Sequence, residues 1–161
     1  MSARVFTSGK IPDVHVRPLK KFVDERGWLS ELWRTDSLDG ASRPVMTYIS
    51  STEPGVVRGP HEHVDQADYF CFIGPGNFKV FLWDNREDSE TFNVHQSFVV
   101  GQDSPAVVVV PVGVVHAYKN VSHHPGIVIN CPDALYMGEN YSQPIDEIRH
   151  EDDPDSPFKV H

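Results

Sequence analysis

Two histidine-bearing segments contain the residues whose types and spacing could do chemistry in this chain. The first segment is Gly55–Asp68 and the second is Pro111–Asn120. Within the first, Arg58, His61 and His63 lie close together in a stretch that is expected to be extended. Successive side chains of a strand alternate between faces, so His61 and His63 share a face, whereas parity alone does not place Arg58 beside them. Two inward-facing imidazoles either hold a metal ion or include a base that removes a proton.

Size and composition indicate one globular domain with a sizeable core. The chain has 161 residues, of which 39% are hydrophobic and 23% are charged. The formal net charge of -9 argues against a nucleic-acid partner, because nucleic-acid binders carry basic faces. Cys71 and Cys131 lie in apolar runs and are expected to be buried free thiols in a reducing cytoplasm. The sequence begins without an apolar leader and has no apolar run of about 18 residues, so neither export nor a membrane partner is expected.

The elements that must position the histidines are predicted to be β-strands. The apolar segments are short, rich in Val, Phe, Tyr and Trp, and separated by turn residues such as Gly, Pro, Asn and Asp. Strands are expected at 28–33, 45–49, 68–73, 78–83, 97–100, 106–110, 116–118 and 126–130. This spacing is typical of a sandwich or jelly roll, so we expect a single all-β domain over residues 1–161 with its core at about 17–136. A short helix or irregular lid is expected within 133–148, and the acidic, proline-rich tail at 151–157 is expected to be solvated.

The two histidine segments resemble the two motifs of the cupin superfamily. The matching residues of the first motif are Gly55, His61, His63 and Asp68, with Asp in the place of the usual Glu, and those of the second are Pro111, Gly113, His116 and Asn120. The resemblance implies a double-stranded β-helix, a small antiparallel barrel whose wide end is lined by inward side chains. Gly55 and Gly113 are expected to permit the tight hairpins that place the histidines.

A narrower resemblance covers most of the chain, from about residue 22 to residue 136. Four segments look like the nucleotide-linked 4-keto-6-deoxyhexose 3,5-epimerases, the dTDP-4-dehydrorhamnose epimerase family: Asp24–Glu31, Gly55–His61, Asp84–Phe92 and Pro111–His116. The resemblance implies a homodimer that uses no metal or cofactor. It also implies a nucleotide-diphosphate sugar as substrate, in deoxysugar biosynthesis for surface polysaccharides or natural products.

The chemistry of such an epimerase needs a base and an acid on opposite faces of the sugar. A 4-keto group acidifies the hydrogens on C3 and C5, because the carbanion that remains is delocalised as an enolate. A neutral histidine suits the base. The resemblance implies that His61 is this base, that Tyr136 is the acid, with Tyr141 as the other candidate, and that His116 lies beside the reacting ring.

The resemblance also implies substrate-binding roles. Arg58 and Arg26 would bind the diphosphate, because a planar fork of donors suits phosphate oxygens. Glu31 and His63 would contact the sugar or the nucleotide base. For Arg26 and Glu31 the structural alternative is that they pair with each other across a hairpin.

Several positions depart from the family pattern. His63 stands where a glutamine is usual, Asp68 falls near an expected lysine, and Tyr48 falls near an expected asparagine. The carboxylate that partners the base is not evident, and the candidates are Asp65, Asp152 and Asp153. These departures favour a changed sugar or nucleotide, or epimerisation at one carbon only.

Three alternatives stay open on the sequence. His63 favours a sugar 3,4-ketoisomerase, in which two histidines shuttle a proton on the same 4-keto substrate. His61, His63, Asp68 and His116 offer a set of ligands suited to Zn, Ni, Mn or Fe(II), which would make the protein a metal-dependent enzyme. A sugar-binding cupin without catalytic activity is the third.

Overall fold

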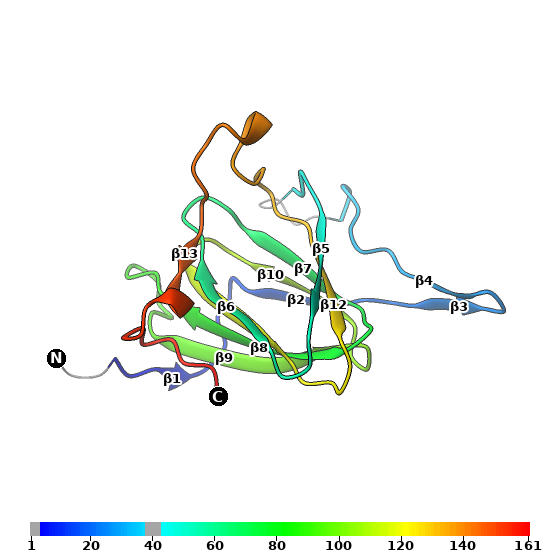
Figure 1. Ribbon diagram of the computed structural model, residues 1–161, viewed down its shortest axis with the longest axis horizontal. Coiled ribbons are helices and arrows are strands. Elements are labelled where there is room, and N and C mark those ends of the chain that lie inside the picture. The colour runs from blue at the N-terminus through cyan, green and yellow to red at the C-terminus, as the bar shows by residue number, and fades with distance from the viewer. Residues whose placement is uncertain (1–3, 38–42) are drawn as a thin grey trace.

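The computed structural model describes residues 4–37 and 43–161, and it shows an antiparallel barrel of two facing sheets (Figure 1). The six-stranded sheet has the spatial order β1 (Thr7–Ser8), β9 (Val94–Gly101), β8 (Asn77–Asp84), β11 (Val114–Asn120), β6 (Val57–Glu62) and β13 (Ile148–Arg149). The five-stranded sheet has the order β2 (His15–Pro18), β10 (Ala106–Val110), β7 (Asp68–Phe72), β12 (Gly126–Asn130) and β5 (Tyr48–Thr52). The predicted all-β jelly-roll fold is confirmed.

Aromatic side chains fill the barrel between the sheets and lead up to the histidines. Phe72, Phe78 and Tyr118 pack with ring centroids 5.5 to 5.7 Å apart. Phe70 contacts both Tyr118 and His116, with centroids 5.6 and 5.4 Å apart. Phe70 and Phe72 alternate along β7, and His116 and Tyr118 alternate along β11, so these rings share the inward face of their strands. The aromatic side chains thus fill the closed part of the barrel, and His116 lies at the boundary with its open end.

The strand predictions succeed where the apolar runs are bounded by turn residues. The bounds of β10 and β12 are those expected, and β7, β8, β9 and β11 overlap the expected strands. The segment 28–33 instead contributes only β4 (Gly27–Leu29), which pairs with β3 (Phe22–Asp24). This hairpin projects away from the barrel (Figure 1).

Residues 151–157 of the acidic tail are mostly exposed, as expected, but the tail is anchored to the barrel, which the sequence did not predict. After a short turn η1 (Glu139–Tyr141), strand β13 pairs with β6 and is followed by η2 (His150–Asp152). Phe158 is only 4% exposed and joins the core cluster of the six-stranded sheet. One buried aromatic side chain and a two-residue strand therefore hold the exposed acidic tail against the barrel, and we call residues 145–158 the C-terminal strap.

The expected free thiols are confirmed, since Cys71 and Cys131 are both buried and unbridged. Among the residues that the structure describes, no helix has the length and apolar character needed to cross a membrane.

Candidate active site

A bulge in β6 brings Arg58 and His61 to the same side of the barrel. In the ladder with β11, His61 lies opposite His116, and Arg58 lies opposite Tyr118, so three steps along β6 face two along β11. The extra residue shifts the alternation of side chains by one position, so Arg58 and His61 face the same side although they are three residues apart. The alternation of a regular strand could therefore not place Arg58. Gly59 sits in this bulge with φ +87°, and a Cβ there would lie 2.6 Å from the His116 carbonyl oxygen. Only glycine fits this approach between the strands.

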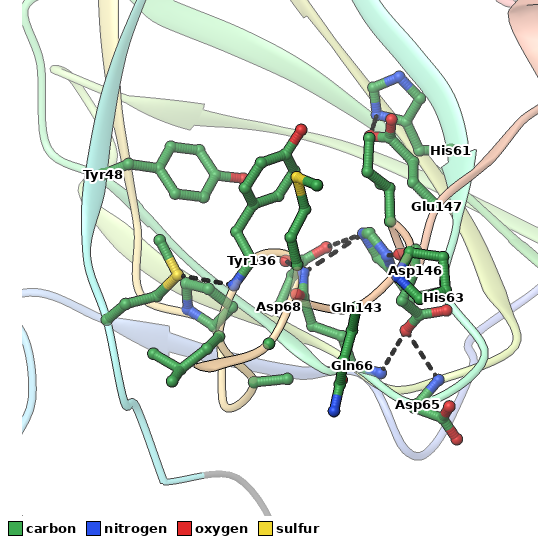
Figure 2. Close-up of a pocket in the computed structure, with 18 of the residues that line it drawn as sticks. Tyr48, His61, His63, Asp65, Gln66, Asp68, Tyr136, Gln143, Asp146 and Glu147 are labelled. Atoms are coloured by element: carbon green, nitrogen blue, oxygen red, sulfur yellow. Dashed lines mark hydrogen bonds and ion pairs between the residues drawn. The ribbon is translucent and has the colours of Figure 1, made fainter. Parts of the chain in front are cut away.

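The open end of the barrel contains a cavity of about 980 Å³. Strands β5, β6, β7 and β11 form its walls, and residues between 132 and 149 complete its rim. Most of the side chains singled out from the sequence line it, namely Arg58, His61, His63, Asp68, His116, Tyr136 and Tyr141. Figure 2 shows His61 and Glu147 on one side of this cavity and Tyr48 and Tyr136 on the other.

His61 lies beside two carboxylates of the C-terminal strap. Its Nε2 is 2.5 Å from Oε1 of Glu151, and its Nδ1 is 3.4 Å from Oε1 of Glu147. Burial has the largest effect on the pKa of His61 and lowers it; the two glutamates oppose this and His116 adds to it, so the net shift is downward. His61 is therefore neutral at pH 7, and a carboxylate on one ring nitrogen orients the ring as a general base requires.

The carboxylate that contacts His61 is Glu151, not one of the three aspartates considered from the sequence. Asp152 pairs with Arg149 at 3.0 Å, and the structure places neither Asp65 nor Asp153 against His61. No motif marks Glu147 or Glu151 in the sequence. Their role depends on the pairing of β13 with β6, which only the fold reveals.

Asp68 accepts contacts from both remaining histidines of the two motifs. The Nε2 atoms of His63 and His116 each lie 3.2 Å from Oδ2 of Asp68, which is 1% exposed. The other carboxylate oxygen, Oδ1, accepts hydrogen bonds from Gln66 Nε2 at 2.9 Å and Asn130 Nδ2 at 2.8 Å. Asp68 is thus held at both oxygens.

Charge pairing shifts the pKa values in this buried group. Burial alone would raise the pKa of Asp68, but the hydrogen bonds and charges of His116 and His63 outweigh it and hold that pKa well below its usual range. Burial alone would lower the pKa of His63, whereas Asp68 and Asp146 raise it to about 9. A proton on His63 is one way to balance the buried carboxylate.

Of the four residues considered from the sequence as metal ligands, three lie close together and one does not. His63, Asp68 and His116 each bring a ligand atom within 4.8 Å of the others, as a metal site requires. His61 does not belong to this group, because its Nε2 is directed at Glu151. The four-residue set is therefore reduced to three.

Two tyrosines form the wall opposite His61. Tyr136 is 48% exposed, and its backbone N–H donates to Met46 Sδ at 3.2 Å. The hydroxyl of Tyr48 accepts a hydrogen bond from Asn130 Nδ2 at 2.7 Å, and burial raises the pKa of Tyr48 to about 12. Tyr141 also lines the cavity but is 73% exposed.

Arg58 presents its positive charge to the cavity. Its Nε donates to Thr52 Oγ1 at 2.9 Å and its Nη2 to the Ser51 carbonyl at 2.7 Å. Within the described ranges, 4–37 and 43–161, no carboxylate forms an ion pair with it. The guanidinium is therefore oriented but not neutralised.

Arg26 and Glu31 do not reach this cavity within their own chain. Arg26 lies at the tip of the β3–β4 hairpin and pairs with Asp24 at 2.5 Å. Glu31 lies 3.4 Å from Arg34. The alternative that these two residues pair with each other is wrong, because each has a nearer partner of its own.

A two-sheet antiparallel barrel with histidines at its open end defines a cupin-type protein. The family model for dTDP-4-dehydrorhamnose 3,5-epimerase matches residues 8–154, and this chain belongs to that family. The predicted family and the predicted class of enzyme, a sugar-nucleotide epimerase, are thereby confirmed.

Named relatives agree with this assignment. A probable low-salt glycan biosynthesis epimerase, Agl13, from Haloferax volcanii is 38% identical over 138 residues, which are 85% of this chain and 86% of the relative. The spore coat polysaccharide biosynthesis protein SpsL of Bacillus subtilis is 34% identical over 139 residues, 86% of this chain and 88% of the relative. Among solved structures, a dTDP sugar isomerase from Desulfovibrio desulfuricans has the same fold, with a TM-score of 0.78 and 23% identity over 91% of this chain and 90% of that one.

Proposed function

We propose that this protein inverts C3, C5 or both in a nucleotide-diphosphate-linked 4-keto-6-deoxyhexose. The observation that carries the proposal is a neutral histidine, His61, held by Glu151 on the opposite side of the cavity from Tyr136 (Figure 2). Family membership supports the reaction type, and relatives named for glycan and spore-coat polysaccharide biosynthesis support a role in supplying deoxysugars. The buried free thiols support a cytoplasmic location.

The proposed proton transfers use these groups in turn. Glu151 accepts the Nε2 proton of His61, which leaves the lone pair on Nδ1, the nitrogen that lies 3.4 Å from Oε1 of Glu147 and that substrate must reach. That nitrogen removes the proton from the carbon next to the ketone, and the electron pair moves onto the C4 oxygen to form an enolate. Tyr136 returns a proton to the opposite face of the same carbon, so the configuration inverts.

Arg58 is proposed to bind the diphosphate. A guanidinium that lacks a carboxylate partner among the described residues and lines the cavity suits a bidentate contact with phosphate oxygens. His116 has both ring nitrogens engaged, one with the Val114 carbonyl and one with Asp68, so its contribution is to position Asp68.

The active form is proposed to be a homodimer. The projecting β3–β4 hairpin exposes Phe22, Val23, Trp28 and Leu29, with Val23 75% and Leu29 64% exposed. A second copy of the chain would cover this apolar arm, and the arm would carry Arg26 towards the partner's substrate. Sedimentation velocity tests the assembly, and replacing Trp28 with serine should shift it to monomer.

Isotope exchange tests the proposed reaction. In deuterated water, NMR of dTDP-, GDP- and CDP-linked 4-keto-6-deoxyhexoses should show solvent deuterium at C3 or C5 with at least one nucleotide. The His61→Asn variant should abolish exchange, Tyr136→Phe should keep exchange but lose inversion, and the matched control Tyr141→Phe should keep both. If both His61→Asn and Tyr136→Phe turn over normally, the proposed site is wrong.

The same experiment distinguishes the proposed epimerase from the alternative, a 3,4-ketoisomerase. That alternative needs His63 as a second proton carrier, but Asp146 and Asp68 occupy both of its ring nitrogens. Solvent deuterium at C5 excludes simple ketoisomerisation, whereas deuterium confined to C3 with a migrated carbonyl would support it.

A further inference from the structure

We propose that Tyr48 is a further catalytic residue, whose hydroxyl donates a hydrogen bond to the C4 oxygen of the sugar and stabilises the enolate. The inference rests on the proposed function, because it assigns a donor to the intermediate of that reaction. Tyr48 begins β5 and lines the cavity. Figure 2 shows its ring reaching from β5 into the cavity, on the side opposite His61.

The Tyr48 hydroxyl is oriented by a buried amide. Tyr48 and Asn130 lie directly opposite each other in the pairing of β5 with β12, and Asn130 Nδ2 donates to the Tyr48 hydroxyl oxygen at 2.7 Å. Residues directly opposite each other on neighbouring strands share a face of the sheet, so their side chains meet. Asn130 is 1% exposed, so water does not compete for its amide.

The partners of Asn130 determine which end of the amide faces Tyr48. Its Oδ1 accepts the backbone N–H of Tyr69 at 3.1 Å, and its Nδ2 also donates to Asp68 Oδ1 at 2.8 Å. The pKa of Asp68 is held well below its usual range, so this carboxylate is ionised and can only accept hydrogen bonds. The two N–H groups of Asn130 are thus both used, one on Asp68 and one on Tyr48.

A hydroxyl that accepts from Asn130 still has its own hydrogen to donate. Within residues 4–37 and 43–161, no protein group accepts that hydrogen. The Tyr48 side chain lines the cavity and is 45% exposed, so the O–H is available to a ligand there. The hydrogen bond from Asn130 also makes this O–H a better donor, because linked hydrogen bonds polarise one another.

The intermediate of the proposed reaction needs a donor of this kind. When His61 takes the proton from the carbon next to the ketone, the C–H electron pair forms a C=C bond and negative charge develops on the C4 oxygen. Donors that are already oriented towards such an oxygen stabilise the transition state that leads to it. Both ring nitrogens of His63 and of His116 already have protein partners, and Arg58 is assigned to the diphosphate.

Tyr48 is suited to hydrogen bonding rather than to proton transfer. Burial has the largest effect on its pKa and raises it, the hydrogen bond from Asn130 opposes this, and the resulting pKa is about 12. Tyr48 therefore keeps its proton at neutral pH, both while the enolate exists and after the carbon is reprotonated. This role differs from that of Tyr136, which gives its proton to the carbon.

Solvent-deuterium exchange at saturating substrate separates the two tyrosines, because exchange needs the enolate but not inversion. Tyr48→Phe should lower the maximal rate of exchange by about 100- to 1000-fold, the loss that follows removal of one donor to an oxyanion. KM should change little, because the hydrogen bond strengthens only as charge develops. The matched control is Ser50→Ala, which removes a hydroxyl two residues along β5 that already contacts the Tyr118 hydroxyl at 3.3 Å, and it should leave the rate unchanged.

A second variant changes the Tyr48 hydroxyl without removing it. Replacing Tyr48 with 3,5-difluorotyrosine lowers the pKa of the phenol, and an ionised phenol cannot donate a hydrogen bond. Exchange in this variant should therefore be lost at a lower alkaline pH than in wild type. A tyrosine that only packs against the substrate would leave the pH profile unchanged.

Circular dichroism and the affinity for the nucleoside diphosphate of the active substrate check that Tyr48→Phe keeps its fold and cavity. If it does not, the pH profile of the difluorotyrosine variant decides alone. Exchange as fast as wild type in Tyr48→Phe, or a rise in KM alone, would refute the role in stabilising the enolate. Exchange that persists while inversion is lost would also refute it and would make Tyr48 the acid. A wild type that exchanges with none of the three nucleotide-linked sugars would reject the proposed function itself, and the role of Tyr48 with it.

Discussion

The contact between Phe158 and the barrel is predicted to control the activity of His61 from a distance. Phe158 packs against His150, Trp83 and Phe6, with ring centroids 4.6, 5.8 and 5.5 Å away. It is 4% exposed, and it ends the strap that carries Glu151. Replacing Phe158 with alanine should therefore release the strap while leaving the cavity's strands in place.

The size of the effect follows from the buried ring. Truncating a buried phenylalanine to alanine costs about 3–5 kcal/mol in protein cores. The strap can relax into solvent, so the lower end, about 3 kcal/mol, is expected. At 1.4 kcal/mol for each tenfold change, the docked state of the strap is disfavoured by about 100-fold. The remaining attachments include β13, the hydrogen bonds that Asp146 accepts from the backbone N–H groups of residues 64–66, and the contacts of His150 with Glu62 and of Glu151 with His61.

Hydrogen exchange measured by mass spectrometry reports the docking directly. Amides of residues 148–158 should lose about 100-fold in protection, while those of β10 and β11 should change little. Solvent-deuterium incorporation into the substrate should fall in parallel, because Glu151 no longer orients His61. Lys159→Arg, at an exposed neighbouring position, keeps a donor for the Pro154 carbonyl oxygen; it is the control and should change neither quantity. If the strap keeps its protection while activity falls, or if the whole barrel loses protection equally, local docking does not control His61.

Three further predictions concern single residues. Glu151→Gln should lower the rate of deuterium exchange by at least about tenfold, because it removes the charge that orients His61; loss of a general acid or base itself costs about 100- to 10,000-fold. The melting temperature should change little. Gly59→Ala should lower the free energy of unfolding by about 1–3 kcal/mol in urea titrations, since its Cβ would collide with the His116 carbonyl oxygen. Burial would raise the pKa of Asp84, but hydrogen bonds from an arginine and two hydroxyls hold it well below its usual range. Its folded pKa is thus below its unfolded value, so its stabilising effect is present above about pH 4 and is lost as pH falls towards the folded pKa; Asp84→Asn should flatten the fall in stability on acidification.

Local patterns were sufficient for the strands that carry the site. The valine run of β10 and the Gly126–Asn130 strand are bounded by turn residues, so their limits could be predicted from the sequence alone. The histidine motifs likewise indicated an inward-facing set at the mouth of a barrel. Resemblance, rather than periodicity, then supplied the candidate base and acid.

Pairing between distant segments could not be predicted. The bulge that aligns Arg58 with His61 depends on the register of β6 against β11, and no local signal encodes it. Glu147 and Glu151 reach His61 only because β13 adds to the edge of β6. Charge composition indicated an exposed tail, which the structure shows, but it gave no sign that Phe158 docks that tail against the barrel.

The two histidines of the His-x-His motif face different partners, although two positions of one extended segment carry them. His61 is directed at carboxylates of the strap, which are 23–24% exposed at their side chains, and its pKa is lowered. His63 is directed at a fully buried carboxylate that also contacts His116. The neutral base His61 and the buried pair of His63 and Asp68 therefore lie next to each other without sharing a carboxylate. Because their carboxylates belong to different segments, Asp68→Asn should leave the hydrogen-exchange protection of residues 148–158 unchanged. A loss of that protection in Asp68→Asn would show that the two histidines act as one unit.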